Sequence, residues 1–219
     1  MTQTVLAIIP ARGGSKGIPR KNLASCGGRP LIDWVCKAAL DSQRVTHPVV
    51  SSDDFDILNH ARELGVMGLP RPPEFAADES TTESVMHHAI EAVGRTDLIV
   101  LLQPTSPLTT GQDIDAAISL LEMTGVDSVV SVVPTHVLLW QGPTPSYDPA
   151  LRPRRQEMAQ MEENGAIYVT TREQWERTGC RFGGKVALHL MDEEHRFQVD
   201  SPADLELCSW LLEKRLVPA

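Results

Sequence analysis

The residues best suited to chemistry lie in a glycine-rich, basic segment near the start of the chain, Pro10-Ala-Arg-Gly-Gly-Ser-Lys-Gly-Ile-Pro-Arg-Lys-Asn22. Glycines let backbone N–H groups approach phosphate oxygens, and the Arg and Lys side chains offset the phosphate charge. The spacing fits neither G-x-x-x-x-G-K-[ST] nor G-x-G-x-x-G, which argues against a P-loop hydrolase and a Rossmann dehydrogenase. A solvated basic loop is the other interpretation. The position directly after an apolar run favours phosphate binding.

Two further segments carry polar side chains at the end of an apolar run. Gln103, Thr105 and Ser106 follow the most apolar stretch of the chain and are bracketed by prolines, which suits hydrogen bonding to a polyol acceptor and equally suits a strand-ending turn. Asp200 ends a strand-like segment, where a carboxylate can hold Mg²⁺ against phosphate oxygens. Asp200 is also placed to cap the following helix, and the two roles are compatible.

Short apolar runs alternate with helical patterns along the chain, and this order must position those residues. We expect strands over 4–10, 47–51, 65–69, 98–102 and 128–133, helices over 30–40, 55–64, from 80–82 onward, 114–123 and 202–214, and a return to the core at 164–169 and 185–190. The alternation predicts an α/β fold with a mostly parallel sheet covered by helices on both faces. Ligands of such sheets bind beyond the carboxyl ends of the strands.

Composition limits the partners. The 219 residues are enough for one compact domain, and a formal net charge of -9 excludes a general nucleic-acid-binding surface. No apolar run approaches the roughly 20 residues that cross a bilayer, and no leader pattern precedes the first strand, so we expect no membrane contact and a cytoplasmic location. The four cysteines are scattered without a C-x-x-C pair, which favours idle thiols over disulfides or zinc.

Seven ordered segments give the chain a specific resemblance to the acylneuraminate cytidylyltransferase (CMP-sialic acid synthetase) family. They are Ile9-Pro-Ala-Arg-Gly-Gly-Ser-Lys-Gly, Ser51-Ser-Asp-Asp54, Arg71-Pro72 with Ala77-Asp78, Leu102-Gln-Pro-Thr-Ser-Pro-Leu108, Arg154-Arg-Gln156, Asn164-Gly-Ala-Ile-Tyr168 and Val199-Asp-Ser-Pro-Ala-Asp-Leu205. The resemblance implies one Rossmann-like (GT-A-type) domain over 1–219, with 134–163 as a small dimerisation and substrate arm. It also implies a homodimer and Mg²⁺-dependent transfer of CMP from CTP to a small acidic acceptor such as a nonulosonic acid, with release of pyrophosphate.

The same resemblance assigns roles to individual residues. It implies that Arg12 and Lys21 grip the triphosphate as the catalytic cations, and that Gln103, Thr105 and Ser106 contact the acceptor. Asp200 is the implied metal ligand. The implied nucleotide-binding residues are Ala11, Arg12, Gly13, Ser15, Lys16, Lys21, Asn22, Arg71 and Thr82, of which Asn22, Arg71 and Thr82 match positions that contact cytosine or ribose.

Three positions depart from the family pattern near the expected acceptor and metal. Gln198 stands where the family usually has the first carboxylate of Asp-x-Asp, and Glu162 stands where it usually has an Arg. The segment Val137-Leu-Leu139 stands where the family has a Lys in the arm. Exchanging Arg for Glu reverses a charge and repels an anion. Our hypothesis is an acceptor other than an ordinary nonulosonic acid: a neutral or amino-bearing sugar, or a phosphonate-like acid whose charge is met by other groups such as Arg152, Arg154 or Arg155. The alternatives are a nucleotidyltransferase using another NTP with a sugar phosphate or phosphonate-like acid, and a non-catalytic nucleotide-binding homologue.

Overall fold

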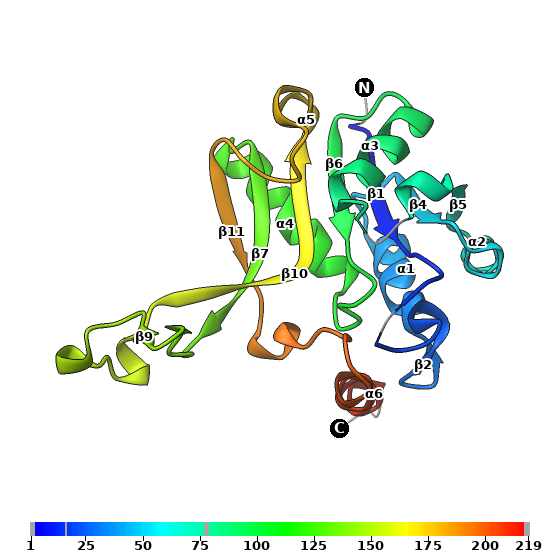
Figure 1. The fold of residues 1–219 in the computed structure, drawn as a ribbon. Helices are drawn as coiled ribbons and strands as arrows, with labels where there is room; N and C mark the ends of the chain where they lie inside the picture. Colours follow the sequence, from blue (N-terminus) through cyan, green and yellow to red (C-terminus); the bar gives the residue numbers. More distant parts are fainter. Residues whose placement is uncertain (1–2, 16, 77–78, 217–219) are drawn as a thin grey trace.

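The computed structural model describes residues 3–15, 17–76 and 79–216, and its centre is a seven-stranded sheet in the order β11-β7-β10-β6-β1-β4-β5 (Figure 1). Its strands are β1 (Val5–Pro10), β4 (His47–Ser52), β5 (Met67–Pro70), β6 (Leu98–Leu102), β7 (Ser128–Thr135), β10 (Gln160–Thr171) and β11 (Val186–Leu190). β10 runs antiparallel to both of its neighbours, and the other pairs in the sheet are parallel. The mostly parallel sheet is therefore confirmed.

Helices cover both faces of this sheet. Strand residues that alternate along β1 divide between two cores: Ala7 and Ile9 pack with α1 (Leu31–Asp41), α2 (Phe55–Glu63) and α4 (Gly111–Thr124). Leu6 and Ile8 pack with α3 (Thr82–Val93) and α5 (Arg172–Thr178). β1 and β6 are buried on both faces, which explains their continuous apolar sequences. The expected α/β class is confirmed.

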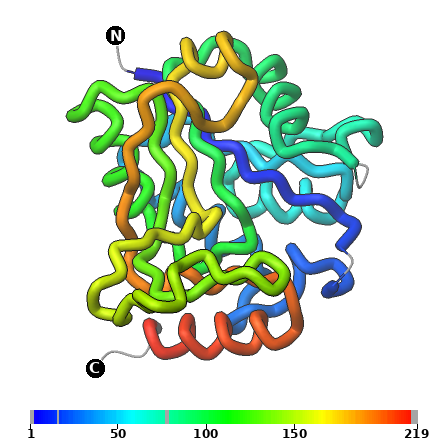
Figure 2. The backbone as a smooth tube through the Cα atoms, turned by 60° about the vertical axis from the view of Figure 1, so that its left-hand side comes forward, coloured from blue at the N-terminus to red at the C-terminus, as the bar shows by residue number. Residues whose placement is uncertain are grey.

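A third core packs the glycine-rich loop, the turn after β6 and the segment before α6 against one helix. α6 (Pro202–Leu216) supplies Cys208 and Leu212, which pack against Ile18 of the glycine-rich loop, Leu108 and Val199. The short hairpin of β2 (Ser25–Cys26) and β3 (Arg29–Pro30) joins the same core through Cys26. Figure 2 shows α6, in red, crossing the edge of the sheet where β1 and β6 end. This helix therefore supports the loops at the carboxyl ends of the strands.

Residues 134–163 project from the sheet, as Figure 1 shows on the left. This arm contains the two-residue strands β8 (Trp140–Gln141) and β9 (Thr144–Pro145) and the 3₁₀ turns Pro149–Leu151 and Arg155–Glu157. β10 begins at Gln160, inside the segment that we expected to be irregular, because Gln160–Glu163 pairs with the end of β7. None of the helices in the described ranges is long and apolar enough to cross a membrane.

Candidate active site

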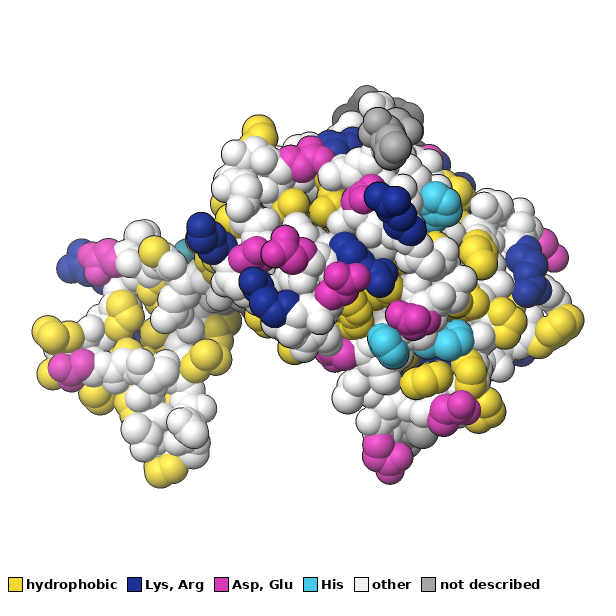
Figure 3. Space-filling view, turned by 90° about the horizontal axis from the view of Figure 1, so that it is seen from above, with side chains coloured by type: hydrophobic (Ala, Val, Ile, Leu, Met, Phe, Trp, Pro, Cys, Tyr) yellow, Lys and Arg dark blue, Asp and Glu magenta, His cyan; other side chains and the backbone are white. Residues whose placement is uncertain are grey.

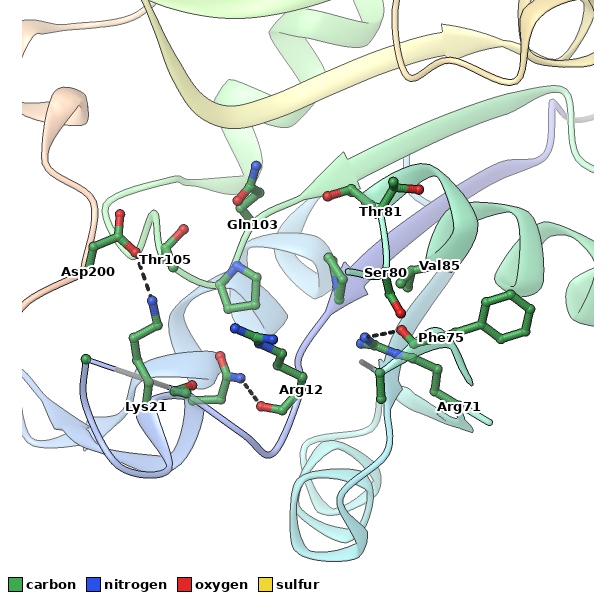
Figure 4. Close-up of a pocket in the computed structure, with 17 residues that line it drawn as sticks. Arg12, Lys21, Arg71, Phe75, Ser80, Thr81, Val85, Gln103, Thr105 and Asp200 are labelled. Carbon is green, nitrogen blue, oxygen red and sulfur yellow. Dashed lines mark hydrogen bonds and ion pairs between the residues drawn. The ribbon is translucent and has the colours of Figure 1, made fainter. Parts of the chain in front are cut away.

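A cavity of about 450 Å³ opens beyond the carboxyl ends of β1 and β6. Figure 4 shows side chains from four segments converging on it: the loop after β1, the stretch from the end of β5 into α3, the turn after β6, and the segment before α6. The lining residues are Pro10, Arg12, Ser15, Gly17, Lys21, Asn22, Arg71, Phe75, Ala76, Ser80, Thr81, Thr82, Val85, Gln103, Pro104, Thr105 and Asp200.

Most of the site residues expected from the sequence meet in this cavity. They are Arg12, Ser15, Lys21, Asn22, Arg71, Thr82, Gln103, Thr105 and Asp200. Lys16 lies outside the described residues, as do Ala77 and Asp78 of the motif after Arg71. Ala11, Gly13 and Ser106 are not among the lining residues.

Each of the three expected residues outside the cavity wall is held by a hydrogen bond that its backbone N–H donates. Ala11 is fully buried, and its N–H donates to the carbonyl of Ser51, which continues the pairing of β1 with β4. Ser106 is 3% exposed, and its N–H donates to the carbonyl of Gln103 in a tight turn. Gly13 donates its N–H to a carboxylate oxygen of Asp53 over 3.0 Å.

The glycine-rich loop is fixed at both of its ends. The Asn22 side-chain amide donates to the carbonyl of Arg12 over 2.9 Å, which closes the loop onto itself. Arg20 adopts a left-handed backbone with φ of 51°, and its guanidinium pairs with Asp56 at 2.6 Å. A non-glycine residue in this region costs free energy, so the turn is maintained by its surroundings. At Gly17 an added Cβ would lie 2.6 Å from the carbonyl oxygen of Asp200, so only glycine allows this approach.

Lys21 and Asp200 form an ion pair at the cavity wall. Lys21 Nζ lies 2.9 Å from Asp200 Oδ1 and also donates to the carbonyl of Val199 over 2.9 Å. The Lys21 side chain is 16% exposed, whereas the Asp200 side chain is 71% exposed. The ammonium is therefore oriented by the protein, while the carboxylate keeps an oxygen open to the cavity.

Arg71 is the most buried cation of the cavity, at 7% exposure. Its guanidinium donates to the carbonyl and the hydroxyl of Ser51 and to the carbonyl of Phe75. Burial lowers the pKa of Arg71, the charge of Asp53 opposes this shift, and the charge of Arg12 adds to it. A guanidinium has five N–H donors, so donors remain for a ligand after these three bonds.

The wall formed by the start of α3 was largely missed by sequence reasoning. Thr81 caps the helix by accepting from the N–H of Ser84, and Ser80 donates to the carbonyl of Glu74. Phe75 lines the cavity and belongs to a 3₁₀ turn, Pro73–Phe75. No periodic pattern in the sequence predicts the position of this turn. Of the Ser80-Thr81-Thr82 run only Thr82 was expected in the site, because cavity lining depends on how α3 packs against β1.

The positions that depart from the family pattern lie around the cavity. Gln198 is absent from the lining residues, and its amide nitrogen donates to the carbonyl of Asn164. Glu162 lies 3.5 Å from Arg196, so its charge is paired at the base of the arm. Val137 and Leu139 are 51% and 62% exposed on the arm. The charge reversal at Glu162 is thus offset by a neighbouring cation.

The residues present fit a magnesium ion bound largely by its substrate. Among the described residues of the cavity wall, Asp200 supplies the one carboxylate, and the described ranges hold no cluster of three acidic, His or Cys ligands. Mg²⁺ is commonly held by one or two carboxylates together with substrate phosphates and water. Asp200 is therefore able to hold the ion only in company with a bound nucleotide.

Comparison with known proteins gives consistent matches over nearly the whole chain. A family model described as cytidylyltransferase matches residues 6–215. An N-acylneuraminate cytidylyltransferase of Oncorhynchus mykiss is 36% identical over 91% of this chain and 48% of its own length. A CMP-N,N'-diacetyllegionaminic acid synthase of Legionella pneumophila is 30% identical over 95% of this chain and 96% of its own length. The chain spans about half the length of its fish relatives.

Two solved structures share the fold. A CMP:2-keto-3-deoxy-manno-octonic acid synthetase complexed with CTP has a TM-score of 0.74 at 18% identity, covering 98% of this chain and 100% of its own. A 4-diphosphocytidyl-2C-methyl-D-erythritol synthase from Anaerococcus prevotii has a TM-score of 0.71 at 13% identity, covering 97% of this chain and 100% of its own. These likenesses show the fold, and the family-model match over residues 6–215 shows that the chain belongs to the cytidylyltransferase family.

Proposed function

We propose that this protein transfers CMP from CTP to an acidic sugar of the nonulosonic-acid type and releases pyrophosphate. The observation that carries the proposal is the convergence of Arg12, Lys21 and Arg71 on one cavity beside the exposed carboxylate of Asp200. Three cations suit a triphosphate, and a single exposed carboxylate suits a phosphate-bound metal ion. The relatives include an N-acylneuraminate cytidylyltransferase and a CMP-N,N'-diacetyllegionaminic acid synthase, which supports an acidic sugar as the acceptor.

The reaction is an in-line displacement at the α-phosphorus. An acceptor hydroxyl oxygen forms the new P–O bond, the bond between the α-phosphorus and the bridging oxygen breaks, and the electron pair leaves with pyrophosphate. Lys21 and Arg12 stabilise the charge that develops on the phosphate oxygens. The hydroxyl proton passes to solvent, since no described side chain is assigned as a general base.

Mg²⁺, held by Asp200 and the nucleotide, would neutralise charge on the leaving pyrophosphate. Asn22, Arg71 and Thr82 are proposed to contact the cytidine, for which an amide and a guanidinium offer matching donors and acceptors. Gln103 and Thr105 are proposed to contact the acceptor, because both line the cavity directly after β6, and Figure 4 shows Gln103 pointing toward β10 and Thr105 beside Asp200. Positioning therefore supplies most of the catalysis.

Pyrophosphate release tests the proposal directly. Each of the four NTPs is combined with Mg²⁺ and with N-acetylneuraminate, N,N'-diacetyllegionaminate, a sugar 1-phosphate or a simple phosphonate. Turnover that requires CTP and a nonulosonic acid is expected. Turnover with another NTP and a sugar phosphate would indicate a nucleotidyltransferase of different nucleotide and acceptor specificity. Nucleotide binding without turnover on any acceptor would indicate a non-catalytic homologue. Arg12→Ala, which removes a cavity cation, is the matched inactive control.

A homodimer is part of the proposal. The arm exposes Leu139, Trp140 and Leu151 at 62%, 59% and 77%, and Figure 3 shows hydrophobic side chains across this projecting part. The edge strand β11 exposes Leu188 and Leu190 at 53% and 56%. Large exposed apolar groups of this kind are typical of protein contacts. Light scattering is expected to give twice the mass of the chain, and Trp140→Glu with Leu151→Glu is expected to give the monomer.

We also propose a cytoplasmic location. Cys26, Cys36, Cys180 and Cys208 are unpaired thiols, as suits a reducing compartment. Fractionation of the source cells checks this proposal, with recovery in the soluble cytosolic fraction as the expected result.

A further inference from the structure

The segment Gln198-Val-Asp200 joins three parts of the candidate active site through hydrogen bonds and an ion pair made by its successive residues. The Val199 N–H donates to the carbonyl of Thr105 over 2.8 Å, and its own carbonyl accepts from Lys21 Nζ over 2.9 Å. Asp200 then pairs with Lys21 on the cavity wall. Gln198 points elsewhere, toward the bulge of β10 at Asn164 and Gly165.

Both the nitrogen and the oxygen of the Gln198 carboxamide make a hydrogen bond. Its nitrogen donates to the carbonyl of Asn164, and its oxygen accepts from the Thr105 hydroxyl over 3.4 Å. The carbonyl of Asn164 is only an acceptor, so the side chain facing it must be a donor. A carboxylate at this position would place one acceptor against another and lose the bond.

The bulge is built to receive this side chain. Gly165 has φ of 66°, and an added Cβ would lie 2.9 Å from the Gln198 amide nitrogen. The strand register of β10 with β7 shifts between Glu163 and Tyr168, across this point. Asn164 is 1% exposed, accepts from Ser131 over 2.6 Å and donates to the carbonyl of His195 over 3.2 Å. The bulge is thus a fixed anchor for whatever bonds to its carbonyl.

The bulge also determines where the acceptor turn lies. The Gln103 N–H donates to the carbonyl of Ala166, one residue beyond Gly165, over 3.3 Å. Thr105 is held from the other side by Gln198 and by the backbone of Val199. Loss of the Gln198 carboxamide removes the side-chain bond between Thr105 and the bulge while leaving Lys21, Asp200 and the phosphate loop in place.

From these contacts we propose that Gln198 is a positioning residue for the acceptor turn, and that Asp200 alone serves the metal ion. Gln198 holds Thr105 against the Asn164–Gly165 bulge and so sets the place of the acceptor hydroxyl relative to the α-phosphorus. The role of Gln198 in placing the acceptor hydroxyl rests on the proposed function. The division of labour between Gln198 and Asp200 is a property of the binding site and is measurable without turnover.

Three variants separate the two residues. Gln198→Met keeps the length of the side chain without its hydrogen bonds, and Gln198→Glu keeps the shape but removes the donor. Both are expected to lower kcat/KM for the acceptor by about 10-fold or more, while the affinities for CTP and for Mn²⁺ in the presence of CTP change less than twofold. Asp200→Asn is expected to weaken Mn²⁺ binding by about 10-fold or more.

Amide hydrogen exchange gives a readout that does not need turnover. Both Gln198 variants are expected to speed exchange at Gly165 and Ala166, whereas Asp200→Asn leaves these amides unchanged. Mn²⁺ binding weakened in Gln198→Met or tightened in Gln198→Glu would overturn the proposal, since either makes residue 198 a metal ligand. Unchanged exchange and unchanged acceptor kinetics in both variants would overturn it too. If wild-type protein turns over no acceptor, the proposed function fails and the exchange result still decides the role of Gln198.

Discussion

Lys21 Nζ and Asp200 Oδ1 lie 2.9 Å apart although 179 positions separate the two residues in the sequence. The contact brings the proposed triphosphate cation to the carboxylate proposed to serve the metal ion. Because the Lys21 ammonium is also fixed by the Val199 carbonyl, it does not depend on Asp200 for its orientation. Loss of the Asp200 contact would therefore leave the Lys21 ammonium held by the Val199 carbonyl.

Removing the Lys21 charge tests its proposed catalytic role. Lys21→Met keeps most of the packing of this largely buried side chain and is expected to lower kcat/KM for CTP by about 100- to 1,000-fold, as loss of one transition-state donor commonly does. Steady-state pyrophosphate release measures the change. Lys37→Met is the matched control, because Lys37 pairs with Asp41 on the exposed side of α1. Equal kinetics in the two variants would remove Lys21 from the mechanism.

Gly17 and Gly14 give a matched pair within the phosphate loop. An added Cβ at Gly17 would meet the Asp200 carbonyl oxygen at 2.6 Å, whereas at Gly14 the described part of the chain places nothing within 4 Å of the same atom. Gly17→Ala must move the loop away from Asp200, so we expect at least a 10-fold loss of kcat/KM for CTP. Gly14→Ala is expected to stay within about twofold of wild type. A larger loss of kcat/KM in Gly14→Ala than in Gly17→Ala would show that the loop does not depend on the close contact between Gly17 and the Asp200 carbonyl.

Arg71→Lys tests the buried guanidinium. Lysine carries the charge but cannot make the forked contacts with Ser51 and Phe75, so both nucleotide binding and stability suffer. We expect KM for CTP to rise about 10-fold and the free energy of unfolding to fall by about 1.5–3 kcal/mol. Urea unfolding and initial rates measure these two effects. A variant with normal stability and normal KM would contradict the assignment.

His189 makes stability depend on pH. Burial lowers its pKa below the ordinary 6.5, the charge of Asp113 opposes this shift, and His195 adds to it. The folded state therefore favours neutral His189, and its contribution to stability is present above the unfolded pKa and is lost as the pH falls through the folded pKa. The loss cannot exceed about 1.4 kcal/mol per pH unit for one proton. His189→Gln is expected to lose less stability than wild type between pH 7.5 and 5.5, and an equal loss would exclude His189 as the cause.

The sequence was sufficient to predict cavity residues where a local pattern and the chemistry of the side chains point to the same place. Arg12 and Lys21 stand in a glycine-rich loop after an apolar strand, and both line the cavity. Ala11 was expected in the site from the family resemblance and Ser106 from its short polar side chain as well, but the pairing of β1 and the turn after β6 bury them. Side-chain direction at a strand end is set by tertiary hydrogen bonds, which sequence spacing does not reveal.

Among the unpredicted elements, α5 and the start of β10 were missed for physical reasons of the same kind. α5 has seven residues and little apolar periodicity, with Trp175 as its core contact, so no 3.6-residue pattern marks it. The start of β10 at Gln160 is made of exposed and mostly polar residues, and it is a strand because β7 extends beside it. Pairing between distant segments, rather than composition, fixes both the arm and the bulge that Gln198 contacts.

The most direct measurement follows the two ends of the triphosphate separately. CTP labelled with ³²P at the α-phosphate or at the γ-phosphate is incubated with the protein, Mg²⁺ and a nonulosonic acid. The account predicts that the α label appears joined to the acceptor, while the γ label appears in pyrophosphate. Free labelled CMP, or CTP that remains intact with acceptors of every class while another NTP is consumed, would contradict it.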